Sequence, residues 1–227
     1  ASDVYKRQAK RNIMKQKPFP HISIPNFVEN EAFVRAAAES FENLNDWVEY
    51  GGGGDGQIQY CSKLGRDKYP PAALKVLDYI CENFDPNHYF YEQLKCFPDY
   101  EFYGGGMMST PNRNDEGGYL GMHVDASHHG INENWVRCYS AILCISEDYD
   151  ESFDLHLFDG DSSRGKLKYE FNTLNVFRCS ANSWHGLPEI TKGLDRKALG
   201  VVYWRVSEDN SAPRVKAKFY NQLELFE

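Results

Sequence analysis

The second half of this 227-residue chain is a succession of short segments in which apolar and polar residues alternate. Loops rich in Gly, Asn, Asp and Ser separate the segments, and no stretch between them has apolar residues at helical spacing. Alternation with a period of two is typical of strands that bury one face. The pattern therefore predicts a β-sandwich or open barrel. Its strands are expected near 100–108, 118–124, 135–145, 153–158, 166–171, 173–179 and 197–206.

The first half of the chain has a different pattern. "PFPHISIPNFV" (18–28) predicts a first strand, and two helices are predicted over 30–44 and 70–84, the first capped by Asn30 and the second begun by proline. We expect both helices to pack outside the sheets. The glycine run at 51–56 lacks the Gly-Lys-Ser/Thr ending of a phosphate-binding loop and is interpreted as a surface or lid loop.

The N-terminal segment is unusual. "DVYKRQ" (3–8) resembles the translation of a transposon end used in sequencing libraries, which would indicate a metagenomic source and make Met14 the native start. The alternative is an ordinary basic, frayed terminus. We expect residues 1–13 to be non-native or disordered and 14–227 to form a single domain.

Charge and cysteine content narrow the function classes. A net charge of −8 disfavours nucleic acid as a partner, although a local basic groove remains compatible with it. The six cysteines contain no C-x-x-C pair, and no signal peptide is recognisable, so we expect reduced thiols and a cytoplasmic protein. No apolar run reaches the length of a membrane span, so no membrane association is expected.

Two residues of "GYLGMHVDASHH" (118–129) suggest a metal site. His123 and Asp125 are two positions apart, so on a strand they point to the same face. A third ligand can come from His185 in "SANSWHGLPEI" (180–190). Two imidazoles and one carboxylate form the facial ligand set of Fe(II) oxygenases, which leaves positions open for substrate and oxygen. The same ligand types also suit Zn(II).

A buried arginine would complete such a site. "GLDRKALGVVYW" (193–204) places Arg196 eleven residues after His185, at the start of an apolar strand. A guanidinium entering a core is costly unless it is paired, and it binds a carboxylate through two hydrogen bonds. Each feature alone has an ordinary explanation: a chance H-x-D, a structural histidine or a solvated strand end. Their combination on a β-rich frame is far more specific.

These segments resemble the prolyl 4-hydroxylase-like branch of the Fe(II)/2-oxoglutarate dioxygenases over residues 18–206. The similar stretches are "PFPHISIPNFV", "FYGGGMMSTPNRNDEGGYLGMHVD", "RCYSAILCISEDYDES", "YEFNTLNVFRCSANSWHGLPEI" and "DRKALGVVYW". The resemblance implies a double-stranded β-helix, or jelly roll, with flanking helices. It implies His123, Asp125 and His185 as metal ligands and Arg196 as the partner of the far carboxylate of 2-oxoglutarate. Retention of Asp125 favours hydroxylation over halogenation.

The sequence departs from the family at two places. Where many members have two glycines it reads "ESFDLHLFD" (151–159), which removes an expected close backbone approach to substrate. Some members have a tyrosine that binds the same carboxylate as the arginine. Alignment from Arg137 puts Cys144 there, whereas Tyr139 has an odd offset from Cys144 and should face the other way. Tyr103 is a further candidate, so the second carboxylate contact stays open.

The resulting hypothesis is an oxygenase that uses Fe(II), 2-oxoglutarate and O2, with ascorbate as a candidate stimulant. It would hydroxylate an unactivated C–H bond of an amino acid, a prolyl residue or another small metabolite, releasing succinate and CO2. The alternative is a non-catalytic jelly-roll module that holds a metal, which would have no need of Arg196. Arg137 and Arg205 are read as solvated strand ends or as anchors for an anionic substrate. The sequence leaves the substrate, peptidyl or small, and the oligomeric state undetermined.

Overall fold

The computed structural model describes residues 14–50, 57–62, 66–100, 111–160, 162–208, 214 and 218–220. The expectations for residues 1–13, the glycine loop 51–56, Tyr103 and nearly all of the segment 100–108 lie outside this part of the chain. No helix within it is long and apolar enough to span a membrane.

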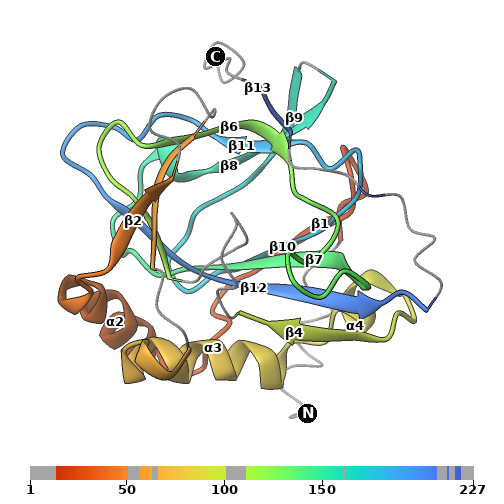
Figure 1. Ribbon diagram of the computed structural model, residues 1–227. Coiled ribbons are helices and arrows are strands. Elements are labelled where there is room, and N and C mark those ends of the chain that lie inside the picture. The colour runs from red at the N-terminus through yellow and green to blue at the C-terminus, as the bar shows by residue number, and fades with distance from the viewer. Residues whose placement is uncertain are drawn as a thin grey trace.

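The described residues include three α-helices, all in the first half of the chain (Figure 1). α2 (Glu31–Ser40) begins where the Asn30 side chain accepts a hydrogen bond from the Ala32 N–H, as expected, and the 3₁₀ turn η1 (Phe41–Asn43) follows it. α3 (Pro71–Asn83) agrees with the predicted second helix. The short α4 (Pro86–Phe90) was not predicted; Asp85 caps it, so "DPNHY" begins a new helix as well as ending the old one.

The strands form two antiparallel layers. One layer has the order β1-β10-β7-β12-β5, and the other has the order β6-β11-β8-β9. β3 joins them by pairing with both β5 and β6, while β2, β4 and β13 attach to β3, β12 and β6. The strands are β1 (His21–Ile24), β2 (Trp47–Tyr50), β3 (Gln57–Ser62), β4 (Cys96–Asp99), β5 (Asn112–Asn114), β6 (Tyr119–Val124), β7 (Trp135–Cys144), β8 (Leu155–Asp159), β9 (Ser162–Leu167), β10 (Leu174–Arg178), β11 (His185–Leu187), β12 (Arg196–Val206) and β13 (Lys218–Tyr220).

The chain crosses repeatedly between the two layers from β5 onward. β5, β7, β10 and β12 lie in the first layer, whereas β6, β8, β9 and β11 lie in the second. This alternation is the double-stranded β-helix, or jelly roll. The predicted fold class, mainly β with flanking helices, is therefore confirmed.

The two faces of the first layer have different neighbours. On its outer face, residues such as Tyr139, Leu143 and Val201 pack with the helices in the largest apolar cluster. Figure 1 shows α2 and α3 along this side of the molecule, away from the second layer. On the inner face, Ile142 and Phe177 meet Leu155 and Leu157 of the second layer. The space between the layers is thus a core in its own right.

Several strands escaped the sequence pattern. β2, β3, β4, β5, β11 and β13 are short, and three of them have only three residues, too few to show an alternation. Strand β9 runs over Ser162–Leu167, earlier than the expected 166–171. Five described cysteines are free thiols, as expected for a reduced protein: Cys81, Cys96, Cys138, Cys144 and Cys179.

Candidate active site

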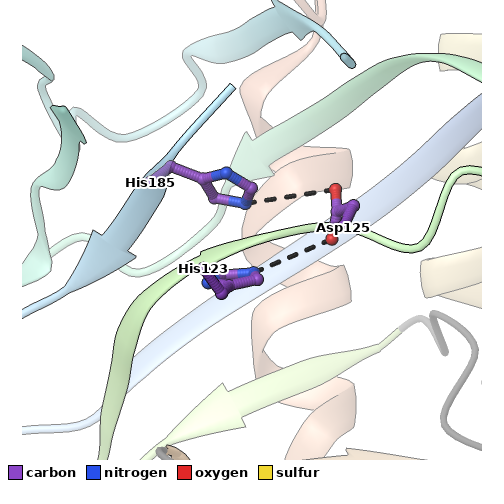
Figure 2. A group of neighbouring side chains, drawn as sticks. All are labelled: His123, Asp125 and His185. Atoms are coloured by element: carbon purple, nitrogen blue, oxygen red, sulfur yellow. Dashed lines mark ion pairs between the residues drawn. The ribbon is translucent and has the colours of Figure 1, made fainter. Parts of the chain in front are cut away.

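Three predicted ligand side chains meet between the two layers. His123 and His185 are direct partners in the register of β6 and β11, and Asp125 follows the end of β6. One ligand atom from each residue lies within 4.8 Å of the others. Figure 2 shows both imidazoles directed toward the carboxylate, whose Oδ1 is 3.7 Å from His123 Nε2 and whose Oδ2 is 4.0 Å from His185 Nε2. The sequence spacing therefore brings together the residues that it was expected to bring together.

Backbone carbonyl groups orient both imidazoles. His123 Nδ1 lies 3.0 Å from the Gly121 carbonyl oxygen, and His185 Nδ1 lies 2.8 Å from that of Ser183. A carbonyl oxygen can only accept a hydrogen bond, so in each neutral ring Nδ1 carries the proton and Nε2 keeps its lone pair. These Nε2 atoms are the ones that His123 and His185 direct toward Asp125. This arrangement is typical of histidines that bind a metal.

The protonation states also suit a metal. Burial lowers the pKa of His185 to about 3, with His123 adding to the effect, so the ring is neutral at neutral pH. Burial would raise the pKa of Asp125, but Arg137 and the two histidines hold it well below its usual range. A neutral His185 imidazole and an ionised Asp125 carboxylate fit a divalent first-row metal such as Fe(II).

Arg196 is buried at the start of β12 and has an unusual environment. Its Nε donates to the Phe153 carbonyl oxygen at 3.1 Å, and its guanidinium carbon lies 5.0 Å from the centre of the Tyr169 ring. Within the described part of the chain, no carboxylate forms an ion pair with it. A buried cation without an anion is costly, so this site calls for an anionic ligand.

An apolar cluster links Arg196 to the metal-ligand group. Phe153 and Tyr169, which contact the arginine, pack with Cys144 and Leu187. Leu187 is two residues after His185 on β11, beyond a shift in the β11–β6 register, and is buried in this cluster. The arginine therefore packs beside a cluster that β11, the strand of His185, helps to form.

The tyrosine proposed for the second carboxylate contact is not in this space. Tyr139 packs against Phe90 on the outer face, and its hydroxyl donates to Glu92 Oε2 at 2.7 Å. Its predicted opposition to Cys144 is observed. The thiol of Cys144 lies on the inner side, where Asn175 Nδ2 donates to it at 3.5 Å. Burial raises the pKa of Cys144 to about 12, so the group is a neutral thiol.

The other histidines lie outside the ligand group. His156 alternates with Leu155 and Leu157, so it points to the outer face of β8, where its Nδ1 is 3.3 Å from Ser163 Oγ. His129 Nδ1 accepts hydrogen bonds from the Ile131 and Asn132 backbone N–H groups. These contacts give both residues a structural role.

Two residues of the site were not identified from the sequence. Arg137 Nη1 lies 2.7 Å from Asp125 Oδ2, and Ser140 Oγ donates to the same oxygen at 3.2 Å. Arg137 had been read as a solvated strand end or a substrate anchor, but its side chain is only 3% exposed. The sequence shows Arg137 at the beginning of an apolar strand, but this position does not indicate that Asp125 is its partner.

The sequence matches no family model and no curated protein, but the fold matches solved structures. A prolyl-4-hydroxylase from Pseudomonas putida has a TM-score of 0.57 and 17% identity, covering 82% of this chain and 92% of that one. A Trichoplax adhaerens prolyl hydroxylase in complex with a hypoxia inducible factor peptide fragment has a TM-score of 0.54 and 12% identity, covering 85% and 87%. The non-heme alpha ketoglutarate dependent carbocyclase SnoK from nogalamycin biosynthesis has a TM-score of 0.53 and 13% identity, covering 98% and 95%. At these identities the likeness establishes the fold that the resemblance implied.

Proposed function

We propose that this protein is an Fe(II)- and 2-oxoglutarate-dependent oxygenase. His123, Asp125 and His185 would bind the metal, and Arg196 would bind the distal carboxylate of 2-oxoglutarate. Two features that occur together carry the proposal. One is the group of three ligand side chains, and the other is a buried arginine that has no anionic partner in the described chain. A purely structural metal site would explain the three ligand side chains, but it would not explain why Arg196 is buried without an anionic partner.

Each residue has a defined task. Fe(II), once bound with 2-oxoglutarate and O2, supplies the oxidising chemistry that yields succinate, CO2 and an oxidised substrate. The two histidines, oriented through Nδ1, would present their Nε2 atoms, and Asp125 would present a charged oxygen. Arg196 orients the co-substrate through a two-point ion pair. Phe153, Tyr169 and Leu187 exclude water around that ion pair, which strengthens it.

We further propose that the reaction is hydroxylation of an unactivated C–H bond. An amino acid, a prolyl residue or another small metabolite remains the proposed substrate. Structures with this fold include a prolyl hydroxylase in complex with a peptide and a carbocyclase from nogalamycin biosynthesis, so the fold accommodates both classes. The retained Asp125 supports hydroxylation over halogenation, as the resemblance implied.

An anaerobic titration tests the co-substrate assignment. Apo-protein is loaded with Fe(II), 2-oxoglutarate is added, and the visible charge-transfer band of the chelate is recorded. We expect a band that is absent in His123→Ala and needs much more 2-oxoglutarate in Arg196→Met. Arg178→Met is the control, because Arg178 is an arginine of the same layer that belongs to neither site and already has a carboxylate partner, Glu92 at 2.8 Å.

The outcomes separate the proposals. No band with folded, Fe(II)-loaded wild-type protein would overturn the oxygenase assignment and favour the metal-binding module. A band that Arg196→Met leaves unchanged would overturn the role of Arg196 alone. With the band established, succinate release and a mass gain of one oxygen atom identify the substrate among peptides, amino acids and small metabolites.

A further inference from the structure

The two carboxylate oxygens of Asp125 have different surroundings. Oδ2 lies 2.7 Å from Arg137 Nη1 and accepts a hydrogen bond from Ser140 Oγ at 3.2 Å. Oδ1 is the oxygen nearest to His123, at 3.7 Å from Nε2. Oδ2 also lies 4.0 Å from His185 Nε2, so both oxygens border the ligand group, and Arg137 and Ser140 hold Oδ2.

The residues that hold Oδ2 are themselves fixed. The Arg137 guanidinium carbon lies 5.4 Å from the centre of the Trp204 ring, and Arg137 and Trp204 are direct partners in the β7–β12 register. Ser140 is also on β7, and its Oγ is 3.3 Å from the Cys179 Sγ. Because Ser140 has a single hydroxyl hydrogen, donation to Asp125 leaves the Cys179 thiol to donate to Ser140. Neither holding group needs to move when a ligand binds.

We propose that Arg137, assisted by Ser140, is a positioning residue that restricts Asp125 to binding the metal through Oδ1 alone. This inference rests on the proposed function. An ion pair and a hydrogen bond at Oδ2 compete with the metal for that oxygen, since the guanidinium charge 2.7 Å away already balances its negative charge. Without them the same carboxylate is able to chelate the ion through both oxygens, as carboxylates often do.

The restriction matters because coordination positions are limited. A facial ligand set of two imidazoles and one carboxylate oxygen leaves three positions of an octahedral ion. A 2-oxo acid that bound through its carboxylate and keto oxygens would take two of them and leave one for O2. A second oxygen from Asp125 would fill that last position. Arg137 would thus preserve the place of oxygen without touching oxygen or substrate.

Nitric oxide, a stable analogue of O2, tests whether a coordination position remains available for O2. Fe(II)-loaded Arg137→Gln is titrated with nitric oxide anaerobically, with and without saturating 2-oxoglutarate, and the electron paramagnetic resonance signal of the adduct is measured. We expect near wild-type uptake without 2-oxoglutarate. With it, we expect uptake weakened by about tenfold or more, the scale of effects from residues behind metal ligands. Arg137→Lys retains one charged donor, and we expect it to restore part of the uptake.

Control variants keep the test decisive. Arg178→Gln removes an arginine–carboxylate pair from the other face of the same layer, with its guanidinium carbon 5.7 Å from the Tyr139 ring, and should leave nitric oxide uptake unchanged. Ser140→Ala should weaken uptake in the same 2-oxoglutarate-dependent manner, but less. If Arg137→Gln does not fold, Arg137→Lys and Ser140→Ala carry the comparison.

Two results would overturn the proposal. One is uptake in these variants that depends on 2-oxoglutarate no more than in the wild type. The other is loss of Fe(II) binding itself in Arg137→Lys and Ser140→Ala, because these residues would then be needed to bind the ion. Failure of the proposed function would look different, since wild-type protein would then show no 2-oxoglutarate band at all.

Discussion

Arg137 and Arg196 are two buried arginines on the same layer that differ in their partners. Arg137, near the start of β7, forms an ion pair with Asp125 inside the ligand group. Arg196, at the start of β12, has a backbone carbonyl and an aromatic ring as neighbours but no carboxylate partner in the described chain. The first charge is balanced by the protein alone, whereas the second needs a ligand to balance it.

This difference separates two uses of a buried guanidinium. A balanced arginine holds a group in place, and its removal leaves that group with a free charge. An arginine without an anionic partner lowers the stability of the ligand-free protein, and binding of an anion restores that stability. The end of the inter-layer space with the unbalanced charge is therefore the end assigned to the co-substrate.

Removal of a proposed metal ligand should have the largest effect. In His185→Ala we expect Fe(II) affinity and succinate release to fall by at least about a thousandfold, because one of three ligands is gone. His156→Ala is the control, since burial also lowers the pKa of His156, to about 4, but its ring lies outside the group. Isothermal titration with Co(II) measures the affinity. Equal losses in both variants would contradict the assignment of the site.

Removal of the Arg196 charge should weaken the binding of 2-oxoglutarate but not the binding of Fe(II). In Arg196→Met we expect the KM for 2-oxoglutarate to rise by roughly a hundredfold, as is typical when one partner of a desolvated charge pair is truncated. Fe(II) affinity should stay within about twofold, and the apo-protein should be as stable as the wild type or more so. Arg196→Lys should give an intermediate KM because it lacks the planar fork. A lowered apo-protein melting temperature with unchanged KM would make Arg196 structural.

The neutral thiol beside Arg196 should contribute little to co-substrate binding. In Cys144→Ala we expect the KM for 2-oxoglutarate to change by no more than about threefold, because the thiol carries no charge and already accepts from Asn175. Stability should fall by about 1 kcal/mol from the lost packing. Kinetic assays and denaturant unfolding measure the two quantities. A rise in KM close to that of Arg196→Met would identify Cys144 as the second carboxylate contact.

The smallest expected effect concerns a histidine that belongs to neither end. His156 has a pKa lowered to about 4 by burial, while the unfolded imidazole titrates near 6.5. The unfolded state therefore binds the extra proton, and stability falls as the pH drops from about 6.5 toward 4. In His156→Gln we expect the loss of apo-protein stability between pH 7 and pH 5 to shrink by about 1–2 kcal/mol. Urea unfolding at the two pH values measures it, and an unchanged loss would contradict the buried, neutral state.

The ligand group was predictable because it depends on local geometry. Side chains two residues apart on a strand point to the same face of the sheet, and this rule predicted that His123 and Asp125 lie together. The same rule put Tyr139 opposite to Cys144, as observed. His185 was located correctly, but its strand β11 was not, since three residues flanked by turns show no alternation.

The Arg137 contact was not predictable because the alternation fails there. The β7–β12 register shifts between Tyr203 and Trp204, so that Tyr203 faces Tyr139 and Trp204 faces Arg137. The extra residue, Cys138, is a β-bulge. Counting by twos from Cys144 would direct Arg137 toward the helices, whereas the bulge turns it inward to Asp125. Such a shift depends on pairing between distant strands and leaves no mark in the local pattern.

Main-chain oxygens, from Gly121 and Ser183, set the proton positions of both ligand imidazoles. Every amino acid supplies the same carbonyl group, so the tautomers do not depend on which side chains occupy these positions. A lineage is therefore free to vary its loops and acquire new substrates while inheriting an intact metal chemistry. The same insulation would let a protein engineer randomise the surroundings of this site in directed evolution without rebuilding its reactive centre.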